Sequence, residues 1–141
     1  MPVNRDSMVI VANDLRAKHG ASYIAEQLYE QAKLSGKNAI IESIRTVGEA
    51  ESLKNKGNFI LFAADADPKV RYERAVVRNS ETDHVSYEKF LSDEQREMDN
   101  TDPTKQNIGK CIQLADHIFL NNGTIEELDK QIEAVMTTLQ F

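Results

Sequence analysis

Short apolar runs alternate with stretches of helical periodicity along the 141 residues of the chain. Three runs have the length of a strand, and they occupy residues 38–43, 59–64 and 117–120. The second, Phe59 to Ala64, is continuously apolar, which is typical of a parallel strand covered on both faces. Because helical segments separate the three runs, the pattern predicts an α/β fold. We expect a three-layer sandwich in which helices flank a short, mainly parallel sheet of about three strands.

Seven helices are predicted, at residues 6–19, 21–34, 46–55, 68–78, 86–98, 103–115 and 124–138. Capping boxes mark two of the starts, Thr46 with Glu49 and Thr124 with Glu127. The pairs Asp67-Pro68 and Asp102-Pro103 mark two others, because an aspartate cap followed by proline favours a first helical turn. Within the first two helices, apolar spacing predicts that the following side chains face the core: Met8, Val11, Leu15, Ile24, Leu28 and Ala32.

Length and charge restrict the classes of protein that fit. A chain of this length suits a single domain, residues 1–141. The net charge of −6 argues against general affinity for nucleic acids or anionic membranes. No window reaches the roughly 18 apolar residues of a membrane span, and Cys111 is the only cysteine. We therefore expect a cytoplasmic protein that binds neither nucleic acid nor membrane.

Arginines give the clearest candidate chemistry. Arg71, Arg74 and Arg78 follow the spacing i, i+3 and i+7, which places them on one face of the predicted helix 68–78. Guanidinium groups donate paired hydrogen bonds to phosphate oxygens, so this face suits a phosphate chain. The alternative is a solvated face whose arginines pair with Glu73, Glu81 or the acidic segment 93–99. The spacing alone does not decide between the two.

Other polar residues carry weaker signals. Arg45 follows the predicted strand 38–43 and would either grip an anion or lie in an exposed loop. Asp65 and Asp67 could bind magnesium, but a helix cap explains Asp67 sufficiently, so we assign no metal site. The remaining residues of this kind, for which we expect structural or surface roles and no catalytic one, are His19, His84, His117 and Cys111.

Four segments together resemble the P-loop nucleotide kinases, especially the dephospho-CoA-kinase-like and archaeal adenylate-kinase-like proteins and the kinase-like N-terminal region of some deoxycytidylate deaminases. The segments are residues 39–45, 64–74, 93–97 and 114–124. The resemblance implies that Arg45 contacts substrate and that Arg71, Arg74 and Arg78 surround donor phosphates. It makes residues 79–98 a lid with Arg96 as its returning arginine. The turn that contains Asn121, Gly123 and Thr124 would lie against an adenine base. The residues themselves identify no cofactor, and the resemblance makes ATP and magnesium possible ones.

One departure from that family is large. The P-loop, or Walker A motif, G-x-x-x-x-G-K-[ST], does not occur, since the chain has glycines only at positions 20, 36, 48, 57, 109 and 123. Phosphoryl transfer depends on the positioning and electrostatics that the P-loop supplies, so we expect little or no transfer by this chain alone. The strand that precedes the P-loop lies mid-sheet in the family. Its absence predicts that segments 38–43 and 59–64 pair directly, or that an open edge recruits another chain.

Three functions remain open at this point. The first is a degenerate or truncated nucleotide-binding domain whose affinity depends on Arg71, Arg74, Arg78 and Arg96. The second is a non-catalytic module for protein interaction or homodimerisation. The third is half of a split kinase whose P-loop another chain supplies.

Overall fold

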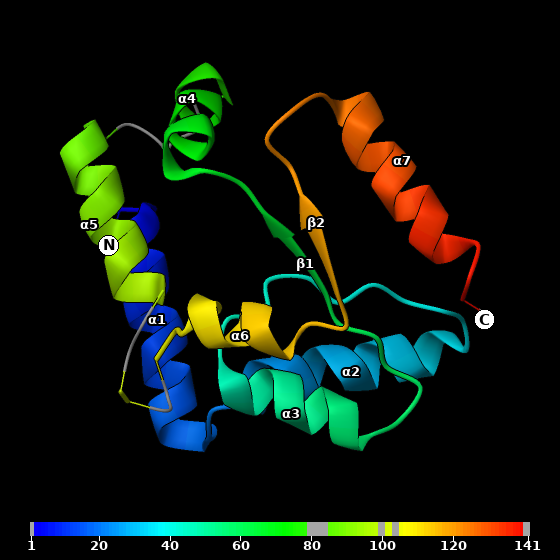
Figure 1. Ribbon diagram of the computed structural model, residues 1–141. Coiled ribbons are helices and arrows are strands. Elements are labelled where there is room, and N and C mark those ends of the chain that lie inside the picture. Colours follow the sequence, from blue (N-terminus) through cyan, green and yellow to red (C-terminus); the bar gives the residue numbers. More distant parts are fainter. Residues whose placement is uncertain (1, 79–84, 99–100, 103–104, 140–141) are drawn as a thin grey trace.

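A computed structural model describes residues 2–78, 85–98, 101–102 and 105–139 (Figure 1). The elements follow the order αααβαααβα and are α1 (Arg5–His19), α2 (Tyr23–Ser35), α3 (Val47–Asn55), β1 (Phe62–Asp65), α4 (Pro68–Arg78), α5 (Tyr87–Met98), α6 (Ile108–Leu114), β2 (His117–Leu120) and α7 (Ile125–Met136). The predicted α/β class is therefore confirmed. Among the described residues, no helix combines the length and apolar character needed to cross a membrane.

Within the described residues the sheet consists of two parallel strands, with Phe62 opposite His117 and Asp65 opposite Leu120. Aromatic contacts hold one face together, since the Phe62 ring meets His117 and Phe119 edge-on at centroid distances of 5.6 and 5.2 Å. Helix α7 lies on the far side of β2 from α1 and α5 (Figure 1). The strands thus stand between α7 on one side and α1 and α5 on the other, and their carboxyl ends point toward α4 (Figure 1).

The predicted strand 38–43 is wrong. Residues 38–45 form no strand or helix, the side chain of Ile40 is 95% exposed, and Ser43 adopts φ = 67°, a left-handed conformation that interrupts extended backbone. The direct pairing of 38–43 with the next strand is wrong as well, so the sheet that the described residues form has two strands rather than about three. An apolar run becomes a strand only when neighbouring backbone satisfies its N–H and C=O groups, and no strand of the described part of the chain lies alongside this run.

The middle strand is shorter than predicted, beginning at Phe62 rather than Phe59. The prediction that both faces of this strand are covered is also wrong, because the side chains of Ile60 and Phe62 are each 38% exposed. The last strand, residues 117–120, is confirmed.

The first two helices form as predicted but bury other residues than expected. Met8 and Val11 are more than half exposed, and Leu28 is exposed, whereas Ser7, Arg16 and Ala25 are buried. Helix α1 meets its neighbours through polar contacts, and the chief one is an ion pair from Arg16 to Glu49 of α3, 3.3 Å long. Both residues are at most 2% exposed.

Helix caps explain most of the other boundaries. Both predicted capping boxes are present, at Thr46 with Glu49 and at Thr124 with Glu127. Helix α4 begins at Pro68 as predicted. Pro103, where the predicted helix 103–115 begins, lies outside the described residues, and the prediction is wrong over residues 105–107, because α6 begins at Ile108 with the Asn107 side chain as its cap. The side-chain oxygen of Asn107 accepts from the backbone N–H of Lys110, the usual contact of a helix cap.

Candidate functional site

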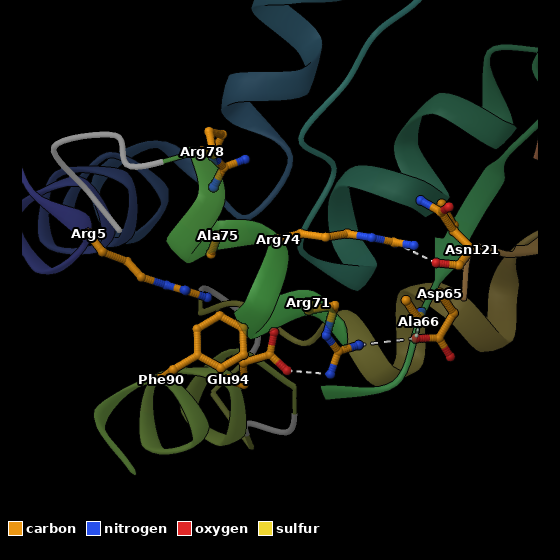
Figure 2. A pocket seen from close by; sticks show the side chains of 11 residues that line it. Arg5, Asp65, Ala66, Arg71, Arg74, Ala75, Arg78, Phe90, Glu94 and Asn121 are labelled. Carbon is orange, nitrogen blue, oxygen red and sulfur yellow. Dashed lines mark hydrogen bonds and ion pairs between the residues drawn. The ribbon is translucent and has the colours of Figure 1, made fainter. Parts of the chain in front are cut away.

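A cavity of about 420 Å³ lies where the carboxyl ends of β1 and β2 meet α4 and α5 (Figure 2). This is the edge of a parallel α/β sheet at which ligands generally bind. The charged residues that line the cavity are Arg5, Asp65, Arg71, Arg74, Arg78 and Glu94. Four arginines against two carboxylates leave a formal net charge of +2, although the whole chain is acidic. The structure therefore brings the arginines of α4 together, as their spacing predicts.

Arg71 lies between the two carboxylates of the cavity (Figure 2). Its Nη1 is 3.2 Å from Oδ1 of Asp65, and its Nη2 donates to Oε2 of Glu94 on α5. This pairing matches the alternative in which the α4 arginines bind acidic side chains of the following helix. The charge of Arg71 is therefore compensated, and its chief role in the fold is to hold β1, α4 and α5 together.

Arg74 makes a different kind of contact. Its Nη1 donates to the backbone carbonyl oxygen of Asn121 and its Nη2 to that of Gly123, the latter over 2.9 Å. Both acceptors are neutral, so they fix the guanidinium against the turn after β2 without cancelling its charge. Arg74 thus presents a positive charge, held in a defined orientation, at the mouth of the cavity.

Arg5 completes the arginine group and was missed by the sequence analysis. It belongs to the first turn of α1, and its Nε and Nη2 donate to the Glu97 carboxylate at 2.9 and 2.6 Å. This hydrogen bond raises the pKa of Arg5 further above its usual value, so its charge is permanent. The guanidinium carbon lies 5.6 Å from the centre of the Phe90 ring, within range of a cation–π contact. No spacing rule relates residue 5 to α4, so only the tertiary structure could reveal it.

Asn121 also lines this cavity, whereas Arg45, Arg96 and Thr124 do not. Arg96 pairs with Asp6 at 2.9 Å, which lowers the pKa of that carboxyl, and Arg45 lies 3.9 Å from Glu97. The structure therefore does not place Arg96 with the arginines of α4. Thr124 caps α7, and the part of the expected lid at 79–84, with His84, lies outside the described residues.

Two backbone N–H groups near the cavity already have side-chain partners. The N–H of Ala66 donates to the side chain of Asp65 and that of Asp67 to the side chain of Asn122. A P-loop holds phosphate with a ring of backbone N–H groups. A ligand in this cavity would instead be held by guanidinium groups.

Metal-ligating and nucleophilic residues add little to this site. Within the part of the chain that the structure describes, no group of three or more His, Cys, Asp or Glu side chains could hold a metal ion. His19 stacks on Tyr23, and Cys111 is buried in the core. Burial raises the pKa of the Cys111 thiol to about 11, which keeps it protonated and unreactive near neutral pH.

Fold and site together define an α/β protein with a cationic cavity at the carboxyl ends of two parallel strands. No protein-family model matches the sequence. Its relatives include the UPF0200 protein of Methanococcus vannielii, 32% identical over 142 residues that cover 98% of this chain and 71% of that protein. The UPF0200 proteins of Sulfurisphaera tokodaii and Staphylothermus marinus are 30% and 28% identical and are covered over 67% and 63% of their lengths. The chain belongs to the UPF0200 family and spans about two thirds of the length of these relatives.

Proposed function

We propose that the chain is a nucleotide- or phosphate-binding domain, similar to the nucleotide kinases but without a Walker A motif, and that alone it transfers little or no phosphate. The observation that carries this proposal is the position of Arg74. Its side chain lines the 420 Å³ cavity and donates its hydrogen bonds to neutral carbonyl oxygens. Among the described residues no carboxylate pairs with Arg74, so an anion that enters the cavity meets a charged guanidinium. Guanidinium groups donate paired hydrogen bonds to phosphate oxygens, so a phosphate monoester or a diphosphate suits this position.

The turn after β2 also supports a nucleotide. Asn121 lines the cavity, and Gly123 is joined to Arg74, so the segment that resembles an adenine-contacting turn borders the arginine group. A phosphate chain among the arginines would thus have its base within reach of this turn. Glu94 and Asp65 would then hold the Arg71 side chain in position and would not themselves bind the nucleotide.

Thermal unfolding in the presence of inorganic pyrophosphate, ATP, ADP, AMP or dCMP tests the proposal, with and without magnesium. At about 100 times its dissociation constant, a ligand of the folded state adds roughly 2.7 kcal/mol, which raises Tm by about 8 °C or more for a chain of this size. Replacing Arg74 with alanine removes a charge-assisted hydrogen bond worth about 1.5–3 kcal/mol, so the affinity should fall about 10- to 100-fold.

Lys69→Ala is the matched control, because Lys69 is an exposed cation of α4 that does not line the cavity. It should leave the affinity unchanged. The proposal fails if none of these anions raises Tm at millimolar concentration, or if Lys69→Ala and Arg74→Ala weaken binding equally.

A second candidate follows from the sheet. Among the described residues β1 pairs only with β2, which leaves its other edge without a strand partner. This observation favours half of a split kinase, completed by a strand and a phosphate-binding loop from another polypeptide. Mixing the chain with the uncovered third of the Methanococcus vannielii protein should then give ATP-dependent phosphoryl transfer that neither part shows alone. Absence of both complex formation and transfer would exclude this candidate.

A further inference from the structure

Two arginines of the large cavity differ in the charge that surrounds them. Nη1 of Arg71 is 3.2 Å from Oδ1 of Asp65, and its Nη2 donates to Oε2 of Glu94. One guanidinium between two carboxylates leaves these three residues, the Arg71 trio, with a formal charge of −1. Within the described residues, Arg74 binds neutral carbonyl oxygens of the turn after β2 and no carboxylate. The cavity therefore has a positive side at Arg74 and a negative side at the Arg71 trio.

Helix geometry places the Arg71 trio beside Arg74. Arg71 and Arg74 are three positions apart on α4, so their side chains leave the same face of the helix. Both line the same cavity as Glu94. Figure 2 shows the Arg74 guanidinium directed toward Asn121. It also shows the Glu94 carboxylate directed toward Arg71. An anion that binds Arg74 and extends along α4 toward Arg71 approaches the Glu94 carboxylate.

Partial burial strengthens the effect of the Glu94 charge. The side chain of Glu94 is 19% exposed, and that of Arg71 is 25% exposed. Water and salt screen charges in such positions less than they screen charges on an open surface. The Glu94 carboxylate also cannot turn into solvent without giving up its hydrogen bond to Arg71. Its negative charge is therefore a fixed part of the cavity lining.

This distribution of charge favours a ligand with one phosphate group. A guanidinium has more N–H groups than the two carbonyl oxygens on Arg74 occupy, so one phosphate group can bind there. A second phosphate group placed toward Arg71 would meet a negative trio and would have to displace Glu94. A second phosphate group placed toward Arg78, the last residue of α4, would pair with an exposed side chain, and exposed ion pairs contribute little. Additional charge on the ligand is therefore not rewarded in either direction.

We propose that Glu94 sets the charge selectivity of the arginine cavity, which takes a ligand with one phosphate group in preference to a ligand with two or more. This selectivity rests on the proposed function and narrows its ligands to phosphate monoesters. Glu94 acts through its charge and through its hold on Arg71, not through contact with the ligand. In Glu94→Gln an amide oxygen can still accept from Arg71, so the substitution removes the charge and keeps the hydrogen bond.

Calorimetry with orthophosphate and pyrophosphate measures the selectivity without a base, and the absence of magnesium keeps both anions at full charge. The wild type should bind pyrophosphate no more tightly than orthophosphate. Glu94→Gln should raise the affinity for pyrophosphate about 10-fold more than the affinity for orthophosphate. The difference should shrink as the salt concentration rises, because ions screen the Glu94 charge. Tighter binding of pyrophosphate than of orthophosphate by the wild type would overturn the proposal, and so would an equal effect of Glu94→Gln on both anions.

Matched variants separate the effect of this charge from effects on folding. Glu88→Gln makes the same chemical change at an exposed position of α5 outside the cavity lining and should leave the ratio of the two affinities unchanged. Asp65→Asn removes the other carboxylate of the Arg71 trio and should shift the ratio in the same direction as Glu94→Gln. Each ratio is measured on one protein, so a change in stability does not alter it. Equal shifts in Glu88→Gln and Glu94→Gln would refute the role of Glu94.

The selectivity and the anion site fail in different ways. If both anions bind and Arg74→Ala weakens them, but Glu94→Gln leaves their ratio unchanged, the selectivity is wrong and the anion site stands. If neither anion binds the wild type or Glu94→Gln at millimolar concentration, the anion site and the selectivity are both refuted.

Discussion

Glu49→Gln tests the buried ion pair on which the packing of α1 against α3 depends. Oε1 of Glu49 accepts from Arg16 Nη2 at 3.3 Å and from the backbone N–H groups of Arg45 and Thr46 at 3.2 and 3.0 Å. Glutamine has nearly the same shape and can still accept from the backbone as the third residue of a capping box. The substitution therefore removes the negative charge and leaves the helix cap in place.

The expected loss follows from the burial of Arg16. With 2% of its surface exposed, Arg16 has Nε and Nη1 atoms that find no partner among the described residues, so Glu49 is its chief compensation. Removing one member of such a pair costs about 3–5 kcal/mol because a buried charge stays behind. Since domains are stable by only about 5–15 kcal/mol, this variant should be partly unfolded at moderate temperature.

Urea unfolding followed by circular dichroism measures the effect. The double variant Arg16→Met with Glu49→Gln should return to within about 1 kcal/mol of the wild type, because it leaves no uncompensated charge. Asp14→Asn is the control, since Asp14 and Lys18 form an exposed pair at 2.8 Å that should contribute less than about 1 kcal/mol. The reasoning is refuted if Glu49→Gln costs no more than Asp14→Asn, or if the double variant is as unstable as the single one.

Two further substitutions give sharp expectations. Gly109→Ala should lower the free energy of unfolding by about 1–3 kcal/mol, because a Cβ there would lie 2.8 Å from the backbone oxygen of Met98. Helix propensity alone would predict a gain of about 1 kcal/mol, so a higher Tm would contradict the close packing of α6 on α5. Cys111 should resist thiol reagents until the chain is unfolded, and rapid labelling of the native protein would contradict its burial. Because its pKa is raised from 9.0 to about 11, the protonated thiol adds stability that is full below pH 9 and disappears as the pH rises to about 11. A Cys111→Ser variant should lose this part of the alkaline decrease in urea midpoint.

Features that depend on local chemistry were predictable from the sequence. Each capping box joins residues three positions apart, so Thr46 and Thr124 mark helix starts without reference to the rest of the chain. The prediction of a strand at 38–43 failed because a strand needs a neighbouring strand, which the spacing of residues cannot reveal. The predicted burial of Met8 and Val11 failed for a related reason. Apolar spacing shows that a helix has an apolar side, but not that another element covers that side.

The candidate site likewise combines features that the sequence predicts with features that only the structure reveals. Arg71, Arg74 and Arg78 share a helix face, so their meeting at one cavity followed from the 3.6-residue period. Arg5 comes from another helix, and Arg96 turns instead toward Asp6 of α1. The sequence also could not predict that Arg71 pairs with carboxylates whereas Arg74 binds backbone carbonyls. Only the fold decides which guanidinium meets a carboxylate and which meets a carbonyl.

The two edges of the sheet are not equivalent. The Gln131 side chain of α7 accepts from the N–H of Leu120 at 3.0 Å and donates to its carbonyl oxygen at 2.8 Å, which imitates the pairing of a neighbouring strand. The outer edge of β2 is thereby occupied at Leu120, while the described residues leave that of β1 without a strand partner. A sheet with two open edges could add copies of itself without end, but one with a single open edge stops after one addition. Association through β1 would therefore give a closed pair of chains and not a filament.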